Sequence, residues 1–208
     1  MIELLTADTP NGKKISIMLE ETDIKYKITK INIFKNEQFK PKFRQISPFS
    51  KTPVIIDHEN SKSVFESGAI LIYLAEKSGK FYDMKDRLLV NQWLMGQMAY
   101  VGPMLGQHHQ FHHYNPGKSK FGEERYFKIA EQIYKDLDER LSNTNYLAGK
   151  NYTIADIATF PWIARHEWHD IGLKRFSNLT RWYSNISKRN AVQKGYDLLG
   201  KGEKIPKV

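Results

Sequence analysis

A carboxylate and a hydroxyl stand side by side at the start of residues 65–74, an apolar stretch whose spacing predicts a helix. Ser67 is expected to be the N-cap, so that unpaired backbone N–H groups and the positive helix end face an incoming carboxylate. Glu66, the residue before it, can accept an ammonium group. One site would then hold both charges of an amino acid. Together with Thr52 and Pro53 upstream, the pair predicts a binding site for a small zwitterionic peptide.

The chain of 208 residues contains no cysteine. This excludes structural disulfides, zinc–thiolate sites and a catalytic thiol carried by the protein itself. Any thiol chemistry must therefore use a sulfur borrowed from a ligand. Glutathione, a γ-glutamyl tripeptide with a free thiol, is the leading candidate for the zwitterionic peptide.

The formal net charge is +9, which attracts anions. The lysines are scattered, and their densest places are Lys13–Lys14, residues 25–30 and residues 201–207. Opposite charges lie near each of these places, so we interpret them as solvated faces. A nucleic-acid interface would combine a basic face with interleaved aromatic residues, and we therefore do not expect a nucleic-acid partner.

No stretch approaches the length that spans a membrane, and no positive region followed by a long apolar run opens the chain. The acidic Glu3 near the start is likewise not typical of a signal peptide. We expect a soluble, cytoplasmic protein without a membrane partner.

The pattern of the chain changes near Met84. Strand-like and helix-like segments alternate before it, whereas the rest is helical in pattern, and such a change commonly marks a domain boundary. We therefore predict two domains, residues 1–80 and residues 87–208, with a helix stop and linker near residues 78–80.

The first domain is predicted to be a thioredoxin-like α/β domain around a mixed sheet, and the second to be all-α. The predicted strands are residues 2–6, 26–33, 54–57 and 62–65, and the predicted helices of this domain follow residues 9–12 and occupy residues 38–46 and 67–77. In the second domain, helices are predicted at residues 85–112, 122–142, 160–170, 176–188 and 190–199, the first two forming an antiparallel pair.

Residues 152–157 have the pattern of a helix start. The Thr153 hydroxyl is expected to cap the N–H of Asp156, whose carboxylate reaches back, while Tyr152 packs on Ile157. We interpret Asp156 as a structural residue rather than a catalytic acid.

Several motifs, in order along nearly the whole chain, resemble the cytosolic glutathione transferase family. They are residues 9–15, 45–48, 65–70 and 102–107, with Thr52–Pro53 and the capping box at Thr153 and Asp156. The bacterial nu-class, whose members act as glutathione-dependent disulfide-bond oxidoreductases, is the most similar class. The resemblance implies a thioredoxin-like N-terminal domain, an all-α C-terminal domain and a homodimer.

The resemblance also implies roles for individual residues. Thr9 and Asn11 match the active-site threonine and asparagine of the family, and Asn11, Gln38, Thr52, Pro53, Glu66 and Ser67 match positions that bind glutathione. Pro53 is expected to be cis, as in the family, with the main chain of Thr52 pairing with the tripeptide like a strand edge.

Thr9 and Asn11 would lie at the N-terminus of the first helix, where hydroxyl, amide and N–H donors stabilise a thiolate more than a thiol. Lowering the thiol pKa by about two units needs roughly 2.7 kcal/mol, which two or three charge-assisted hydrogen bonds supply. The tyrosine that many transferases use for this purpose has no counterpart at Thr6 or Thr9.

We therefore expect a glutathione-dependent disulfide-bond reductase that uses glutathione as co-substrate and no metal. In the nu-class a second glutathione can lie beside the first and complete the cycle. Conjugation of glutathione to electrophiles, reduction of organic peroxides, and a noncatalytic glutathione-binding module are the alternatives. A small disulfide or an electrophile would be the second substrate.

Two features leave alternatives open. The family has a basic residue that reaches glutathione from the partner subunit at the position of Gln132, where this chain has an uncharged amide. The spacing of His108, His109, His112 and His113 is compatible with a divalent metal, but no acidic or cysteine partner lies nearby in sequence. One or two of these histidines are instead candidates to bind a second glutathione or an anionic substrate.

Overall fold

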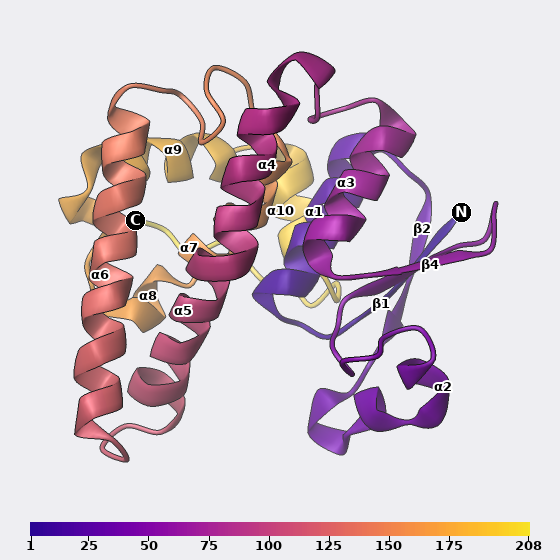
Figure 1. Ribbon diagram of the computed structural model, residues 1–208, viewed down its shortest axis with the longest axis horizontal. Helices are drawn as coiled ribbons and strands as arrows, with labels where there is room; N and C mark the ends of the chain where they lie inside the picture. The colour runs from indigo at the N-terminus through magenta and orange to yellow at the C-terminus, as the bar shows by residue number, and fades with distance from the viewer. The chain divides into compact units, whose positions relative to one another are not determined.

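The computed structural model describes residues 1–208, which form two compact units (Figure 1). The N-terminal unit comprises Met1–Tyr82 and Arg189–Lys204, and the helical unit comprises Asp83–Lys188 and Ile205–Val208. The predicted fold class is confirmed, since the first unit contains a four-stranded mixed sheet and the second is built of helices. Residues 189–204, predicted from the sequence to belong to the second domain, pack with the sheet-containing unit.

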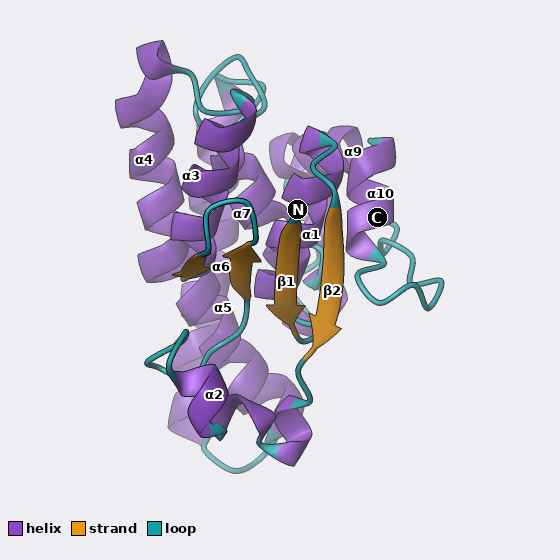
Figure 2. Ribbon diagram, turned by 90° about the vertical axis from the view of Figure 1, so that its right-hand side faces the viewer, coloured by secondary structure: helices purple, strands orange, loops and turns teal.

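The sheet has the strand order β2-β1-β3-β4. Its strands are β1 (Ile2–Thr6), β2 (Tyr26–Lys30), β3 (Val54–Asp57) and β4 (Lys62–Phe65). β1 and β2 are parallel (Figure 2), and the pairs β1–β3 and β3–β4 are antiparallel. The predicted strand 26–33 ends early, at Lys30, because the Asn32 side chain accepts hydrogen bonds from the N–H groups of Phe34 and Lys35 and begins a short helix there.

Helix α1 (Pro10–Thr22) is the centre of the N-terminal unit. It packs against β1, α3 (Ser67–Ser78) and α10 (Asn190–Tyr196), and its residues 12–19 are all buried. Lys13 and Lys14 lie in this stretch with 0% and 2% exposure. The expectation that they lie on a solvated face is wrong, because neighbours cover α1 on every side.

Helix α10 approaches α1 closely at Gly195. A Cβ atom at this position would lie 2.5 Å from the backbone of Ile17, and the Ser16 hydroxyl donates to the Gly195 carbonyl at 2.5 Å. Arg189 forms a bidentate ion pair with Glu21, with N–O distances of 2.5 and 2.7 Å. These contacts explain why the last predicted helix belongs with the sheet and not with the other helices.

The helical unit contains most of the remaining helices. They are α4 (Arg87–Gly96), α5 (Gly102–His108), α6 (Lys120–Ser142), α7 (Ile154–Ile163), α8 (His166–His169) and α9 (Ser177–Ser187). α5 and α6 pack side by side in opposite directions (Figure 1). The predicted helix 85–112 is not one regular helix, because π-helical turns at Gln97–Val101 and His109–Tyr114 interrupt it. None of the helices is long and apolar enough to cross a membrane.

Shorter elements complete the two units. They are α2 (Pro41–Arg44) and the 3-10 helices Ile33–Lys35, Glu37–Phe39, Met84–Asp86 and Leu173–Arg175.

The capping box at the start of α7 is confirmed. The Asp156 carboxylate accepts from the N–H of Thr153 at 3.0 Å, and the Thr153 side chain accepts from the first turn of the helix. Asp156 also accepts from the N–H of Leu147 and from the indole N–H of Trp182, both at 2.9 Å. Burial raises the pKa of Asp156 to about 6. This carboxylate is therefore committed to holding α7, the Leu147 loop and α9 together.

Three imidazoles are buried in the core of the helical unit. His108 donates from Nε2 to the carbonyl of His169 at 2.9 Å, and the hydroxyl of Tyr134 is hydrogen bonded to Nδ1 of His169 at 2.6 Å. His109 stacks on His169 and on Trp162. Burial lowers the pKa of all three imidazoles, that of His109 to about 3.

This burial predicts that acid weakens the helical unit. An unfolded histidine titrates near pH 6.5, so between about pH 4 and 6 the unfolded chain binds a proton that folded His109 does not, and the free energy of unfolding falls as the pH falls. Asp156 acts in the opposite sense in this window because its pKa is raised in the folded state. We expect His109→Phe to reduce the slope of unfolding free energy against pH by about 1.4 kcal/mol per pH unit.

Urea unfolding at a series of pH values measures this slope. The exposed His113 provides the matched control, since His113→Phe is expected to keep the slope of the unaltered protein. An unchanged slope in His109→Phe would contradict the assignment of His109 as a buried neutral imidazole.

Candidate functional site

The N-terminus of α1 carries the two predicted catalytic residues. Thr9 is the N-cap, and its side-chain oxygen accepts from the N–H of Gly12 at 3.1 Å. Because a hydroxyl can accept and donate at once, the Thr9 proton remains available to a group in front of the helix. Asn11, two residues on, is half-buried in the first turn. The pair can offer hydroxyl and amide hydrogen bonds at the positive end of a helix.

Gly12 sets the position of this helix end. A Cβ atom there would lie 2.4 Å from the Thr6 hydroxyl and 2.5 Å from the Ala7 carbonyl. Only glycine permits this approach, so the start of α1 is held directly against the end of β1.

The main chain of Thr52 is a second feature of the site. The loop before it is internally bonded, because the Ser47 hydroxyl donates to the Lys51 carbonyl at 2.8 Å and accepts from the Lys51 N–H at 3.1 Å. The N–H and C=O of Thr52 make no hydrogen bond within the chain. The Thr52–Pro53 peptide bond is cis, as the family resemblance implied. Thr52 thus presents a strand-like edge to which another peptide can add.

The start of α3 differs from expectation in one residue. Glu66 occupies the N-cap position, with φ 68° and ψ 117°, and its carbonyl accepts from the N–H of Ile70 at 2.9 Å. The prediction that Ser67 is the N-cap is therefore wrong, and Ser67 is the first helical residue. A non-glycine residue with positive φ is strained, and such residues cluster where ligands bind.

The shift by one residue changes what Ser67 does. Its side chain is buried and receives a hydrogen bond from Nζ of Lys14 at 3.3 Å. The first N–H groups of α3 still lack acceptors within the helix, as at any helix start. Glu66 is exposed beside them. The predicted combination of a carboxylate with a helix N-terminus is therefore present.

Gln38 lies in the 3-10 helix Glu37–Phe39. The predicted helix 38–46 is shorter, since Lys40 adopts an extended ψ of 140° before Pro41 begins α2. The Gln38 amide donates from Nε2 to the Ile33 carbonyl at 3.4 Å, while its Oε1 is buried without a partner. An unpaired buried acceptor is costly and suits a ligand that brings a donor.

Strand register brings these residues to one edge of the sheet. Leu5 pairs with Val54 and Val54 with Phe65, so the segments that follow β1, precede β3 and follow β4 meet at the same edge. These segments carry Thr9, Asn11, Thr52, Pro53, Glu66 and Ser67. Thr6 pairs with Lys30 in the parallel β2, so the chain that leads to Gln38 leaves from this edge as well.

Lys14 is the residue of this region that sequence reasoning missed. Burial lowers its pKa well below the usual value, and the nearby Glu66 partly offsets that effect. The apolar residues Ile15, Ile17 and Met18 that follow it indicate a helix with a buried face, but the residue type of Lys14 itself gives no sign of burial, which depends on packing against distant segments.

The other predicted candidates lie in the helical unit. Gln132 donates to Asp136 at 2.7 Å along α6. His108 and His109 are core residues, whereas His113 is exposed and stacks on Trp168 with ring centroids 4.0 Å apart. The chain contains no group of three or more His, Asp or Glu side chains placed to hold a metal ion.

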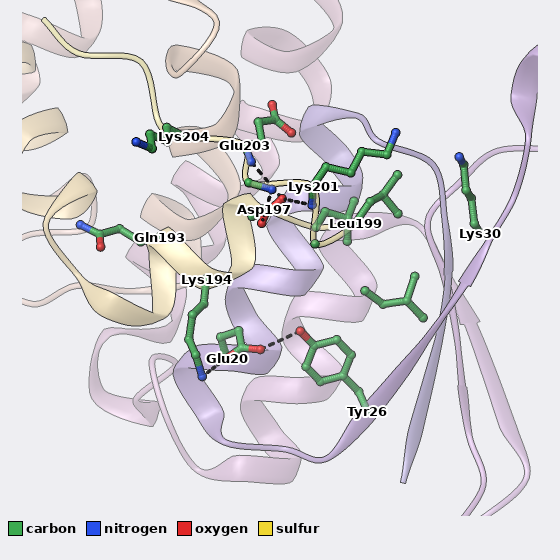
Figure 3. A pocket seen from close by; sticks show the side chains of 14 residues that line it. Glu20, Tyr26, Lys30, Gln193, Lys194, Asp197, Leu199, Lys201, Glu203 and Lys204 are labelled. Atoms are coloured by element: carbon green, nitrogen blue, oxygen red, sulfur yellow. Dashed lines mark hydrogen bonds and ion pairs between the residues drawn. The ribbon is translucent and has the colours of Figure 1, made fainter.

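A groove of about 940 Å³ lies elsewhere on the N-terminal unit, between α1, β2 and residues 193–204 (Figure 3). Its polar groups largely bind one another: Glu20 accepts from Tyr26 at 2.7 Å and from Lys194 at 3.3 Å, and Asp197 accepts from backbone N–H groups of residues 201–203. None of the predicted site residues lines it.

Comparisons with known proteins agree with this fold. Residues 3–76 match the model of the glutathione S-transferase N-terminal domain, and residues 106–190 match that of the C-terminal domain. The disulfide-bond oxidoreductase YfcG of Escherichia coli is 42% identical over 199 residues, which cover 92% of this chain and 93% of YfcG.

Two solved structures are similar throughout. A glutathione transferase from Burkholderia graminis, with two glutathione molecules bound per subunit, has a TM-score of 0.90 and 36% identity, covering 97% of this chain and 89% of that one. A glutathione transferase from Pseudomonas putida, with one glutathione disulfide bound per subunit, has a TM-score of 0.88 and 36% identity, covering 96% and 92%. With both domains matched and more than a third of the residues shared, this chain belongs to the glutathione transferase family.

Proposed function

We propose that this protein is a glutathione-dependent disulfide-bond reductase in which bound glutathione supplies the reactive thiolate. The observation that carries the proposal is the convergence of three peptide-binding features at one edge of the sheet: the donors of Thr9 and Asn11, the unbonded main chain of Thr52, and the carboxylate of Glu66 at the start of α3. A chain without cysteine needs an external sulfur for such chemistry.

Each part of the tripeptide has a complementary group. The γ-glutamyl ammonium would pair with Glu66, and its carboxylate with Ser67 and the N–H groups of α3. The cysteinyl main chain would add to Thr52 beside Pro53, and the buried Oε1 of Gln38 would accept from a ligand N–H. The sulfur would then lie in front of Thr9 and Asn11.

The proposed chemistry begins with ionisation of this sulfur. Hydrogen bonds from Thr9 and Asn11 and the positive end of α1 favour the thiolate over the thiol. The thiolate attacks one sulfur of a disulfide, forms a mixed disulfide with it and expels the other sulfur as a thiolate. A second glutathione thiolate then attacks the glutathione sulfur of the mixed disulfide, so that glutathione disulfide and a second thiol leave. Two electrons pass from two glutathiones to the substrate.

The names of similar proteins support this choice among reactions. YfcG and YghU of Escherichia coli, 42% and 34% identical to this chain, are both named disulfide-bond oxidoreductases. The structure from Burkholderia graminis holds two glutathiones per subunit, the number that the two-step cycle consumes, and that from Pseudomonas putida holds glutathione disulfide, the product of the cycle. We further propose a cytoplasmic homodimer that acts on small disulfides.

Conjugation of glutathione to electrophilic carbon is the second candidate reaction, because it would use the same thiolate. Reduction of organic peroxides would do so as well. We expect turnover of hydroxyethyl disulfide to exceed that of an aryl halide, measured as kcat/KM with reduced glutathione. The reverse order would make conjugation the main activity, and glutathione-dependent thermal stabilisation without turnover of either substrate would indicate a noncatalytic binding module.

Thr9 gives a direct test of the thiolate step. Removing one hydrogen bond to a charged group costs about 1.5–3 kcal/mol, so we expect Thr9→Ala to lower kcat/KM for hydroxyethyl disulfide by about 10- to 100-fold and to raise the pKa of bound glutathione, read from ultraviolet thiolate absorbance against pH.

The matched control is Thr9→Ser, which retains the hydroxyl and is expected to retain both the activity and the thiol pKa. Because Thr9 also caps α1, thermal unfolding of both variants separates the lost cap, worth about 1 kcal/mol, from the lost donor. An unchanged thiol pKa in Thr9→Ala would remove Thr9 from the catalytic machinery.

A further inference from the structure

Two consecutive buried lysines of α1 have different surroundings. Lys13 is matched by carboxylates: its Nζ lies 2.9 Å from Asp8 and 2.5 Å from Glu203, donates to the Tyr196 carbonyl at 2.6 Å, and lies over the Tyr196 ring. These contacts account for its charge within the fold. Lys13 joins the start of α1 to the segment that follows α10.

Lys14 points to the other side, toward α3. Its Nζ donates to Oγ of Ser67 at 3.3 Å, and the carboxylate whose charge acts on it belongs to Glu66, which is exposed. Burial lowers the pKa of Lys14 well below its usual value, and the attraction of Glu66 does not compensate fully. An additional anion beside Ser67 would therefore stabilise the charged form of Lys14.

The hydrogen bond from Lys14 fixes the chemistry of Ser67. Because Lys14 Nζ donates this bond, Ser67 Oγ is its acceptor, and the Ser67 proton is directed to a different acceptor. The N–H groups of the first turn of α3 are donors as well. In its charged form Lys14 thus adds a buried positive charge beside the N–H and hydroxyl donors of this helix start.

The carboxylate of Glu66 narrows the class of ligand. A simple anion would be attracted to Ser67 and Lys14 but repelled by Glu66. A simple cation would be attracted to Glu66 but repelled by Lys14. A group with a carboxylate and an ammonium on one carbon satisfies both. The arrangement suits the free α-amino acid end of a γ-linked peptide, which carries both charges.

We propose that Lys14 is a positioning residue for the α-carboxylate of the bound peptide, acting through Ser67 and through its buried charge. This inference rests on the proposed glutathione site and goes beyond it, since it assigns recognition of one ligand group to a residue that the ligand does not touch.

Calorimetric titration with three peptides tests the assignment: reduced glutathione, an analogue without the α-carboxylate (4-aminobutyryl-cysteinyl-glycine) and an analogue without the α-amino group (glutaryl-cysteinyl-glycine). In Lys14→Met we expect Kd to rise about tenfold for glutathione and for the glutaryl analogue, and less than twofold for the aminobutyryl analogue. Lys14→Arg, which keeps the charge, is expected to restore the difference in Kd between the two analogues that the unaltered protein shows.

Lys13→Met is the matched control, because it removes an equally buried charge from the same helix without a link to Ser67. Its Kd values are expected to stay within about twofold of those of the unaltered protein. If Lys14→Met does not fold, Lys14→Gln removes the charge with a smaller change of polarity and must show the same selectivity among the peptides.

Equal weakening for all three peptides would overturn the proposal, because it would reduce Lys14 to a packing residue. Failure of the unaltered protein to bind glutathione would overturn the proposed function instead. The two failures are distinguishable, since the first leaves normal glutathione binding in the unaltered protein and in Lys13→Met.

Discussion

The register of β1, β3 and β4 is the constraint on which the candidate site depends. Leu5 pairs with Val54 and Val54 with Phe65, and this alignment puts the starts of α1 and α3 and the loop before β3 at a single edge. A slip of one residue in either pair would turn the buried side chains of a strand outward, so burial of Leu4 and Val54 fixes the register strongly. Packing of the sheet thereby positions the polar groups of the candidate site.

Helix α1 connects this edge to the rest of its unit. Its first turn carries Thr9 and Asn11, and its buried middle meets α3 on one side and α10 on another. Glycine permits close approach at two points, at Gly12 against β1 and at Gly195 against Ile17. Residues 189–204 therefore belong to the N-terminal unit for a physical reason: they cover α1 and supply carboxylate and carbonyl partners for Lys13.

Local patterns in the sequence were sufficient where the chemistry is local. The capping box at Thr153 and Asp156 is a contact between residues three apart, and the four strands have clear apolar runs. The sequence could not reveal that Asp156 also binds Trp182, or that Lys13 and Lys14 are buried, because both depend on packing between distant segments. The N-cap at α3 was misplaced by one residue for a related reason: the positive φ of Glu66 is set by the turn from β4 and has no signature in the residue type.

Charge at the start of α3 shows how a basic protein can discriminate among anions. A net charge of +9 attracts any anion at long range, and this attraction carries little selectivity. Around Ser67, however, an exposed carboxylate and a buried lysine lie on different elements, Glu66 between β4 and α3 and Lys14 on α1. Opposite charges at short range favour a ligand that carries the complementary pair of charges. Such a site therefore selects a zwitterion, although the long-range potential of the protein attracts all anions. Burying Lys14 costs free energy, and in this site that cost serves selectivity for a zwitterion. This role explains why Lys14 lies beneath the start of α3 and not on the solvated surface.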